Sequence, residues 1–116
     1  MGQPVAWFDI TAKDAAKAHK FYAELFGWNI DANNPMNYGM VDTGSSEGIP
    51  GGIGQAGNGN QPGIVLYVAV QDAKASLEHV ERLGGKTEVP PYEIPGTGVM
   101  AVFQDPDGNR VGLWQR

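Results

Sequence analysis

The chain contains no cysteine, and this absence excludes several kinds of site at once. Without thiols there can be no disulfide, no thiolate zinc centre and no cysteine nucleophile. Basic residues are also few: eight Lys and Arg stand against 13 Asp and Glu, for a net charge of −5. No basic cluster occurs, so no nucleic-acid partner is expected. The acidity promotes solubility and would suit a cationic ligand.

Long apolar runs are missing as well. No stretch approaches the ~18 consecutive apolar residues that a membrane span needs, so no membrane association is expected. The first ten residues, MGQPVAWFDI, lack the basic region and the apolar run of a signal peptide. A cytoplasmic location is therefore expected.

What is present is enough for one packed domain. The 116 residues are 41% hydrophobic and include 17 glycines. This length fits a single compact domain, and the glycines favour tight turns and closely spaced strands over a helical bundle. We expect one domain over residues 1–116.

One pattern of secondary-structure elements occurs twice along the chain. VAWFDIT (5–11) reads as a strand, Asp14 as a helix N-cap, the following residues as an amphipathic helix, and Gly27 as its end. Downstream, IVLYVAV (64–70) is followed by Asp72, a second helix pattern and Gly84-Gly85. Asp14 and Asp72 lie 58 residues apart, and this offset also places Leu25 on Leu83.

Three short extended segments follow each predicted helix. They lie near 28–31, 38–43 and 51–55, and again near 86–89, 98–104 and 110–115. GGIGQ (51–55) matches VGLWQ (111–115) at an offset of 60. The sequence therefore predicts an α+β fold of two tandem βαβββ modules, about 5–55 and about 64–115, joined by a flexible connection at 56–63.

At two places the chain resembles the vicinal-oxygen-chelate superfamily, which includes glyoxalases, bleomycin-resistance proteins and extradiol dioxygenases. The segments are FYAELFGW (21–28) and DPDGN (105–109), and the resemblance extends over about Val5 to Gln115. It implies mixed sheets curled around a cleft with the helices outside, and commonly a homodimer. It also implies a divalent metal in the cleft, held by His, Gln or Glu from the first and last strand of each module.

Counting from these motifs places the four implied metal-ligand positions at residues without a ligating side chain. The first-strand positions are Trp7 and Val65, and the last-strand positions are Gly52 and Gly112. Trp, Val and Gly side chains do not bind a metal. We therefore expect no metal and no cofactor. His19 and His79 lie on the predicted helices, where packing or surface roles are expected rather than a metal site.

The same strands supply a set of candidate ligand-binding residues. Side chains alternate along a strand, so Asp9 shares a face with Trp7, and its equivalent in module two is Tyr67. The last strands contribute Gln55 and either Trp114 or Gln115. The complete candidate set is Trp7, Asp9, Tyr38, Met40, Gln55, Val65, Tyr67, Met100 and Trp114. This set predicts an aromatic-lined site for a small molecule.

Asp9 and Trp7 each allow more than one interpretation. Asp9 could be a feature of the fold that accepts hydrogen bonds from the adjacent loop, a ligand-binding group, or a catalytic general base. Trp7 could pack in the core or an interface, or stack on a ligand.

Three functions follow from these alternatives. The chain could sequester a drug or metabolite without metal, as the bleomycin-resistance branch suggests. It could be a lyase or isomerase that works without metal and uses Asp9, with Tyr67, for proton transfer. It could also be an interaction module whose pocket is vestigial.

Overall fold

The computed structural model describes residues 2–57 and 61–116 and has an α+β fold. Module one consists of β1 (Val5–Ala12), α1 (Ala15–Phe26), β2 (Asn29–Asp31), β3 (Gly39–Asp42) and β4 (Gly51–Gln55). Module two consists of β5 (Gly63–Val70), α2 (Ala73–Arg82), β6 (Lys86–Ile94), β7 (Gly98–Gln104) and β8 (Arg110–Gln115). The predicted βαβββ duplication is confirmed.

The chain forms two compact units that nearly coincide with these modules. One unit is Trp7–Ile64, and the other is Val65–Arg116 together with the residues up to Ala6. The backbone N–H of Ala69 accordingly donates to the carbonyl oxygen of Pro4 at 2.9 Å. Residues 58–60 of the predicted connection lie outside the described residues. No helix in the described part of the chain is long and apolar enough to cross a membrane.

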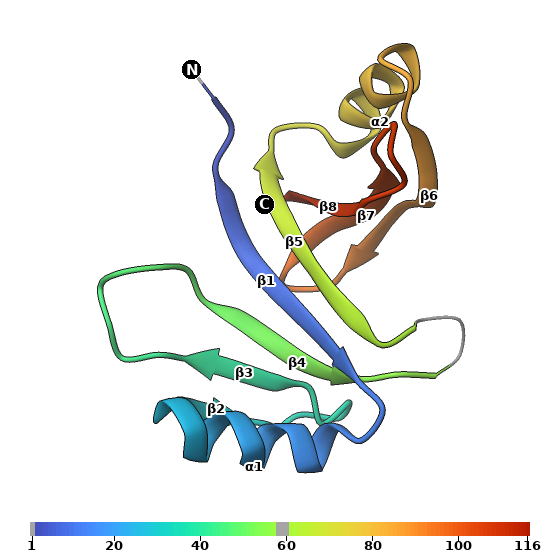
Figure 1. The fold of residues 1–116 in the computed structure, drawn as a ribbon. Helices are drawn as coiled ribbons and strands as arrows, with labels where there is room; N and C mark the ends of the chain where they lie inside the picture. The colour runs from blue at the N-terminus through green and yellow to red at the C-terminus, as the bar shows by residue number, and fades with distance from the viewer. Residues whose placement is uncertain (1, 58–60) are drawn as a thin grey trace. The chain divides into compact units, whose positions relative to one another are not determined.

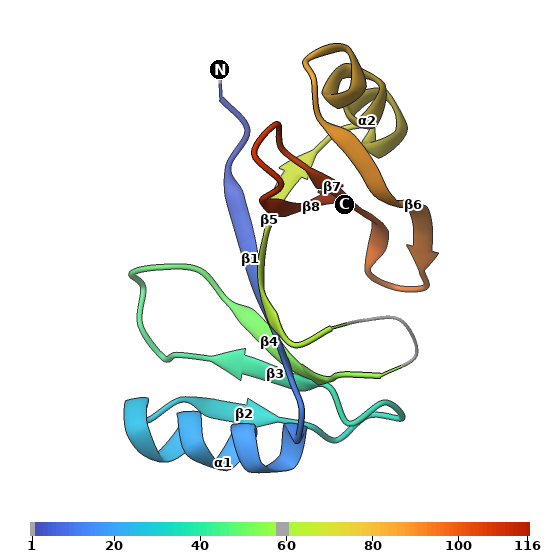
Figure 2. The ribbon, with the colours of Figure 1, turned by 45° about the vertical axis from the view of Figure 1, so that its right-hand side comes forward.

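Each module has the same strand arrangement. In module one, β1 and β4 pair in parallel, β4 pairs with β3, and β3 pairs with β2, the last two antiparallel. In module two, β5 and β8 pair in parallel, followed by antiparallel β7 and β6. Figures 1 and 2 show α1 beside β2 and α2 beside β6. Each helix therefore covers one face of its own module's sheet.

Both helices begin as the sequence predicts. Asp14 and Asp72 have extended backbones, and their side chains accept the N–H of Lys17 and of Ala75, respectively. Such caps satisfy backbone donors that the first helical turn leaves unpaired. Gly27 ends α1 at φ 71°, a left-handed conformation that costs glycine little.

A second cap, built from the last strand, is also duplicated. The side-chain oxygen of Gln55 accepts the N–H of Ala15 at 2.9 Å, and that of Gln115 accepts the N–H of Ala73 at 2.8 Å. Gln55 also donates to the carbonyl oxygen of Lys13 at 2.6 Å. Each glutamine thus ties the end of its module to the start of that module's helix.

The two modules pack different side chains beside their helices. In module two, an aliphatic cluster forms between α2 and the sheet from Val70, Ala73, Leu77, Ala101 and Leu113. In module one, the rings of Phe8, Tyr22, Phe26 and Trp28 pack together, with centroids 5.0 to 6.2 Å apart. His19 Nε2 lies 2.9 Å from the carbonyl oxygen of Ile53, which confirms its packing role, and His79 is exposed.

The DPDGN segment is a tight turn closed by its first residue. One oxygen of Asp105 accepts the N–H groups of Asp107 and Asn109, both at 2.9 Å, and the other accepts the Asn109 amide at 2.9 Å. Gly108 has φ 90°. These bonds from Asn109 hold the pKa of Asp105 below its ordinary value. The turn fixes the backbone immediately before Arg110, the first residue of β8.

Candidate functional site

In module one, the sheet face opposite α1 carries most of the predicted residues of that module. Asp9 and Met40 both lie opposite Gly52 in the register, and directly paired residues share a face. Trp7 and Thr11 share that face with Asp9 by alternation along β1. We call Trp7, Asp9, Thr11, Tyr38, Met40 and Gly52 the helix-free face of module one.

Tyr38 is the centre of a hydrogen-bonded network on this face. Its hydroxyl donates to Asp9 Oδ1 at 2.6 Å and accepts from Trp7 Nε1 at 3.2 Å. Thr11 Oγ1 donates to Asp9 Oδ2 at 3.2 Å. Asn34 holds the Tyr38 backbone by bonds of 2.7 and 2.9 Å to its carbonyl and N–H groups. Both Asp9 oxygens therefore accept bonds from module one itself.

The ring of Tyr38 also occupies the space above Gly52. A Cβ atom built on Gly52 would overlap the hydroxyl and ring carbons of Tyr38. No larger residue fits at position 52 while Tyr38 keeps this position. The glycine and the tyrosine thus form one packed unit.

The equivalent face of module two repeats this packing with a different tyrosine. Tyr67 lies opposite Gly112, and a Cβ atom on Gly112 would overlap the Tyr67 ring. Met100 and Val102 lie opposite Trp114 and Gly112. We call Val65, Tyr67, Met100, Val102, Gly112 and Trp114 the helix-free face of module two. Val65, Tyr67 and Met100 are buried, and Trp114 Nε1 donates to the carbonyl oxygen of Thr97 at 3.1 Å.

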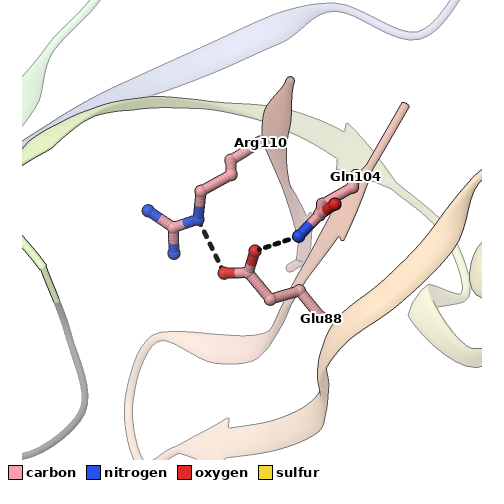
Figure 3. Close-up of polar contacts among 3 residues, drawn as sticks. All are labelled: Glu88, Gln104 and Arg110. Atoms are coloured by element: carbon pink, nitrogen blue, oxygen red, sulfur yellow. Dashed lines mark hydrogen bonds and ion pairs between the residues drawn. The ribbon is translucent and has the colours of Figure 1, made fainter. Parts of the chain in front are cut away.

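A polar cluster lies at one end of this second face (Figure 3). Gln104 and Arg110 are directly paired in the register, and Gln104 Nε2 donates to Glu88 Oε1 at 3.0 Å. Arg110 Nε donates to Glu88 Oε2 at 2.6 Å. The hydrogen bond from Gln104, supported by the Arg110 guanidinium, holds the pKa of Glu88 below its ordinary value.

Comparison with known proteins agrees with this duplicated architecture. The model of the Glyoxalase/Bleomycin resistance protein/Dioxygenase superfamily matches residues 5–113. The chain belongs to this superfamily. One curated relative is the putative glyoxylase CFP32 of Mycobacterium tuberculosis, which is 35% identical over 94% of this chain and 44% of its own length. Another is the anthracycline biosynthesis protein DnrV of Streptomyces peucetius, which is 32% identical over 96% of this chain and 46% of its own length. The chain spans less than half the length of these relatives.

Two solved structures show the same fold at low sequence identity. Methylmalonyl-CoA epimerase from Mycobacterium tuberculosis is 13% identical, with a TM-score of 0.67 over 95% of this chain and 85% of that one. The hypothetical protein BH1468 from Bacillus halodurans is 10% identical, with a TM-score of 0.74 over 100% of this chain and 96% of that one.

The residues at the four implied ligand positions of the superfamily do not fit a metal. Trp7 and Val65 offer no ligating atom, and Gly52 and Gly112 have no side chain and lie beneath tyrosine rings. Within residues 2–57 and 61–116, no three His, Asp or Glu side chains come together in a way that could hold an ion. The bound metal that the superfamily implies therefore has no donor set at these positions.

Gln55 was predicted to bind the ligand, and the structure places its side chain against the start of α1 instead. Gln55 pairs with Ala12, one step out of phase with Asp9 and Gly52, so its side chain lies on the helix side and caps α1. The same phase puts Gln115 beside α2 and Trp114 on the helix-free face. The other eight predicted residues lie on the two helix-free faces, and their contact with a ligand stays a prediction.

Two features of the site were missed. The sequence predicts Tyr38 only as a lining residue, and the β2–β3 connection that presents it is longer than the β6–β7 connection of module two. Glu88, Gln104 and Arg110 were not predicted, although alternation along β8 puts Arg110 on the face of Gly112 and Trp114.

Proposed function

We propose that this protein binds a drug or metabolite without a metal, through the aromatic helix-free faces of its modules. The observation that carries this proposal is the tyrosine packing over both glycines at implied metal-ligand positions, Tyr38 over Gly52 and Tyr67 over Gly112. At both last-strand positions, a tyrosine ring stands where the superfamily would place a polar metal ligand. Flat, mostly apolar molecules match aromatic-lined sites through stacking and burial of area.

The names of the relatives support a small molecule as the ligand. Two relatives are called anthracycline biosynthesis proteins and two are called putative glyoxylases. Both names concern small organic molecules. An unidentified small molecule is thus the proposed partner. The homodimer that the resemblance implies remains a prediction, and sedimentation velocity tests it.

The experiment is a titration with an anthracycline in the presence of EDTA, read by equilibrium dialysis. The expected result is saturable binding that added Zn²⁺ or Mn²⁺ does not strengthen. Trp7→Ala and Trp114→Ala should weaken binding, because both rings lie on helix-free faces. Trp28→Phe is the matched control, since Trp28 packs with Phe8 and Tyr22 on the helix side. Binding that appears only after metal is added would contradict the proposal.

A second candidate function uses Asp9 as a general base. The observation in its favour is the 2.6 Å bond between the Tyr38 hydroxyl and Asp9, a carboxylate–phenol pair that could pass a proton. The base in this candidate is supported by Tyr38 rather than by Tyr67. It ranks second because both Asp9 oxygens already accept bonds from the protein.

Proton exchange tests this second candidate. Deuterium incorporation into dihydroxyacetone, measured by NMR in D₂O with EDTA, should occur with the wild type and disappear with Asp9→Asn. Tyr22→Phe is the control, since Tyr22 lies in the aromatic cluster under α1. Exchange no faster than in protein-free buffer would exclude this activity for that substrate.

A further inference from the structure

The guanidinium of Arg110 lies near Gly112, the position at which the superfamily would supply a metal ligand from the last strand. Arg110 begins β8 two residues before Gly112, so its side chain emerges on the helix-free face of module two, about 7 Å along the strand. The Tyr67 ring covers Gly112, and Trp114 follows on the same face. A positive charge therefore stands at the end of a row of aromatic side chains.

The position of this guanidinium is fixed from two directions. Its backbone follows the Asp105–Asn109 turn, which is closed by three hydrogen bonds to the Asp105 carboxylate. Its Nε donates to Glu88, which is itself held by Gln104. A side chain held in this way loses less conformational entropy on binding than a mobile surface arginine would.

The guanidinium of Arg110 carries further N–H donors besides Nε. Figure 3 shows the Nε atom joined to Glu88, with no dashed line drawn from either terminal nitrogen. Within the described ranges, Nε is the one nitrogen of Arg110 that has a hydrogen-bond partner. Two parallel N–H groups at the end of a guanidinium match the two oxygens of a carboxylate.

Module one has no equivalent of this cluster. At the offset of 60, Arg110 corresponds to Pro50 and Gln104 to Gly44. Its own carboxylate, Asp9, is held by neutral donors, Tyr38 and Thr11. Module two thus has Arg110 where module one has Pro50, and it also has Arg116, whose guanidinium carbon lies 5.1 Å from the centroid of the Trp114 ring.

We propose that Arg110 recognises a carboxylate on a flat aromatic ligand, and that Glu88 and Gln104 are positioning residues for it. The inference rests on the proposed binding function and names the class of its ligand. The net charge of −5 would favour cations at long range. Salt screens that field beyond about 8 Å, whereas a direct guanidinium–carboxylate contact acts within hydrogen-bond distance.

Matched pairs of probes test the inference: benzoate with benzamide, 2-naphthoate with 2-naphthamide, and 9-anthracenecarboxylate with its amide. Each pair shares a ring system and differs in charge. Isothermal titration with EDTA should show the carboxylate of the best-fitting ring binding roughly tenfold or more tightly than its amide. Arg110→Gln should remove this preference and leave amide binding unchanged.

Two further variants separate the roles. Glu88→Gln should reduce the carboxylate preference severalfold by releasing Arg110, with amide binding retained. Arg82→Gln, on α2, should change neither. Equal binding of acid and amide by the wild type, or a preference that survives in Arg110→Gln, would overturn this inference and leave the proposed function intact. If no ring system binds in either form, this inference fails, and the anthracycline titration decides the proposed function separately.

Discussion

The two modules share one backbone plan but stabilise it with different chemistry. Under α2 a cluster of buried aliphatic residues packs together, whereas under α1 partly exposed rings and a half-buried histidine pack beside the helix. On the helix-free faces, module one has the Trp7–Tyr38–Asp9 network, and module two has the Glu88–Gln104–Arg110 cluster beyond an apolar surface. Both modules share the caps and the strand pairing that define the fold, whereas the side chains on their helix-free faces differ.

The largest expected effect concerns the helix-side packing. Leu77 is 5% exposed within the aliphatic cluster, and at the offset of 58 it corresponds to His19. Leu77→Ala should lower the free energy of unfolding by about 3 kcal/mol, because it leaves a cavity. Leu83→Ala, at a position 68% exposed, is the control and should cost less than about 0.5 kcal/mol. Urea denaturation measures both, and equal losses would contradict the role of Leu77 in the aliphatic cluster.

The Tyr38 network should have the next largest effect. Tyr38→Phe removes a donor to Asp9 and an acceptor for Trp7, so unfolding free energy should fall by about 1–2 kcal/mol. Tyr22→Phe removes a hydroxyl from the ring cluster of the same module and should change little. Urea denaturation of both variants decides the point: a Tyr38→Phe protein as stable as Tyr22→Phe would mean that the network contributes nothing.

The glutamine caps test what the modules share. Gln55→Leu and Gln115→Leu each remove an acceptor for the first N–H of a helix, and each should cost about 1 kcal/mol. Thermal unfolding followed by circular dichroism compares them. Closely similar losses are expected from the shared plan, and a loss confined to one variant would show that only one module uses this cap.

The smallest expected effect is on pH dependence. Gln104 and Arg110 hold the pKa of folded Glu88 below its unfolded value of 4.5. This stabilisation is present above pH 4.5 and is lost as pH falls through the lower folded pKa. Glu88→Gln should therefore be less stable than wild type by about 0.5–1 kcal/mol at pH 7, and the difference should shrink towards pH 3. Urea midpoints across this range give the comparison, and a constant difference would contradict it.

Sequence periodicity and offsets predicted the elements that depend on local chemistry. Asp14, Asp72 and Gly27 start or end helices through their own backbone or short side chains, so their roles can be read locally. The direction of Gln55 could not be read this way, because it depends on the register of β4 against β1. Nor could the Asp9–Tyr38 bond be predicted, because it joins residues 29 apart through a connection that is shorter in module two.

The Glu88–Gln104–Arg110 cluster could not be predicted from the sequence for a related reason. Arg110 follows a turn that the sequence predicts, but Glu88 reaches it from a strand with register shifts between Thr87 and Val89. A bulge changes which side chains face each other, and the alternation of the sequence does not reveal it. The four implied metal-ligand positions, in contrast, follow from fixed distances to the motifs and needed no tertiary information.

Metal analysis of the intact protein tests the central claim most directly. The protein would be incubated with Zn²⁺, Mn²⁺, Ni²⁺ and Co²⁺, dialysed, and analysed by inductively coupled plasma mass spectrometry. Because Trp7, Val65, Gly52 and Gly112 provide no ligands, the account predicts far less than one ion per chain for each metal. One tightly held ion per chain would contradict it.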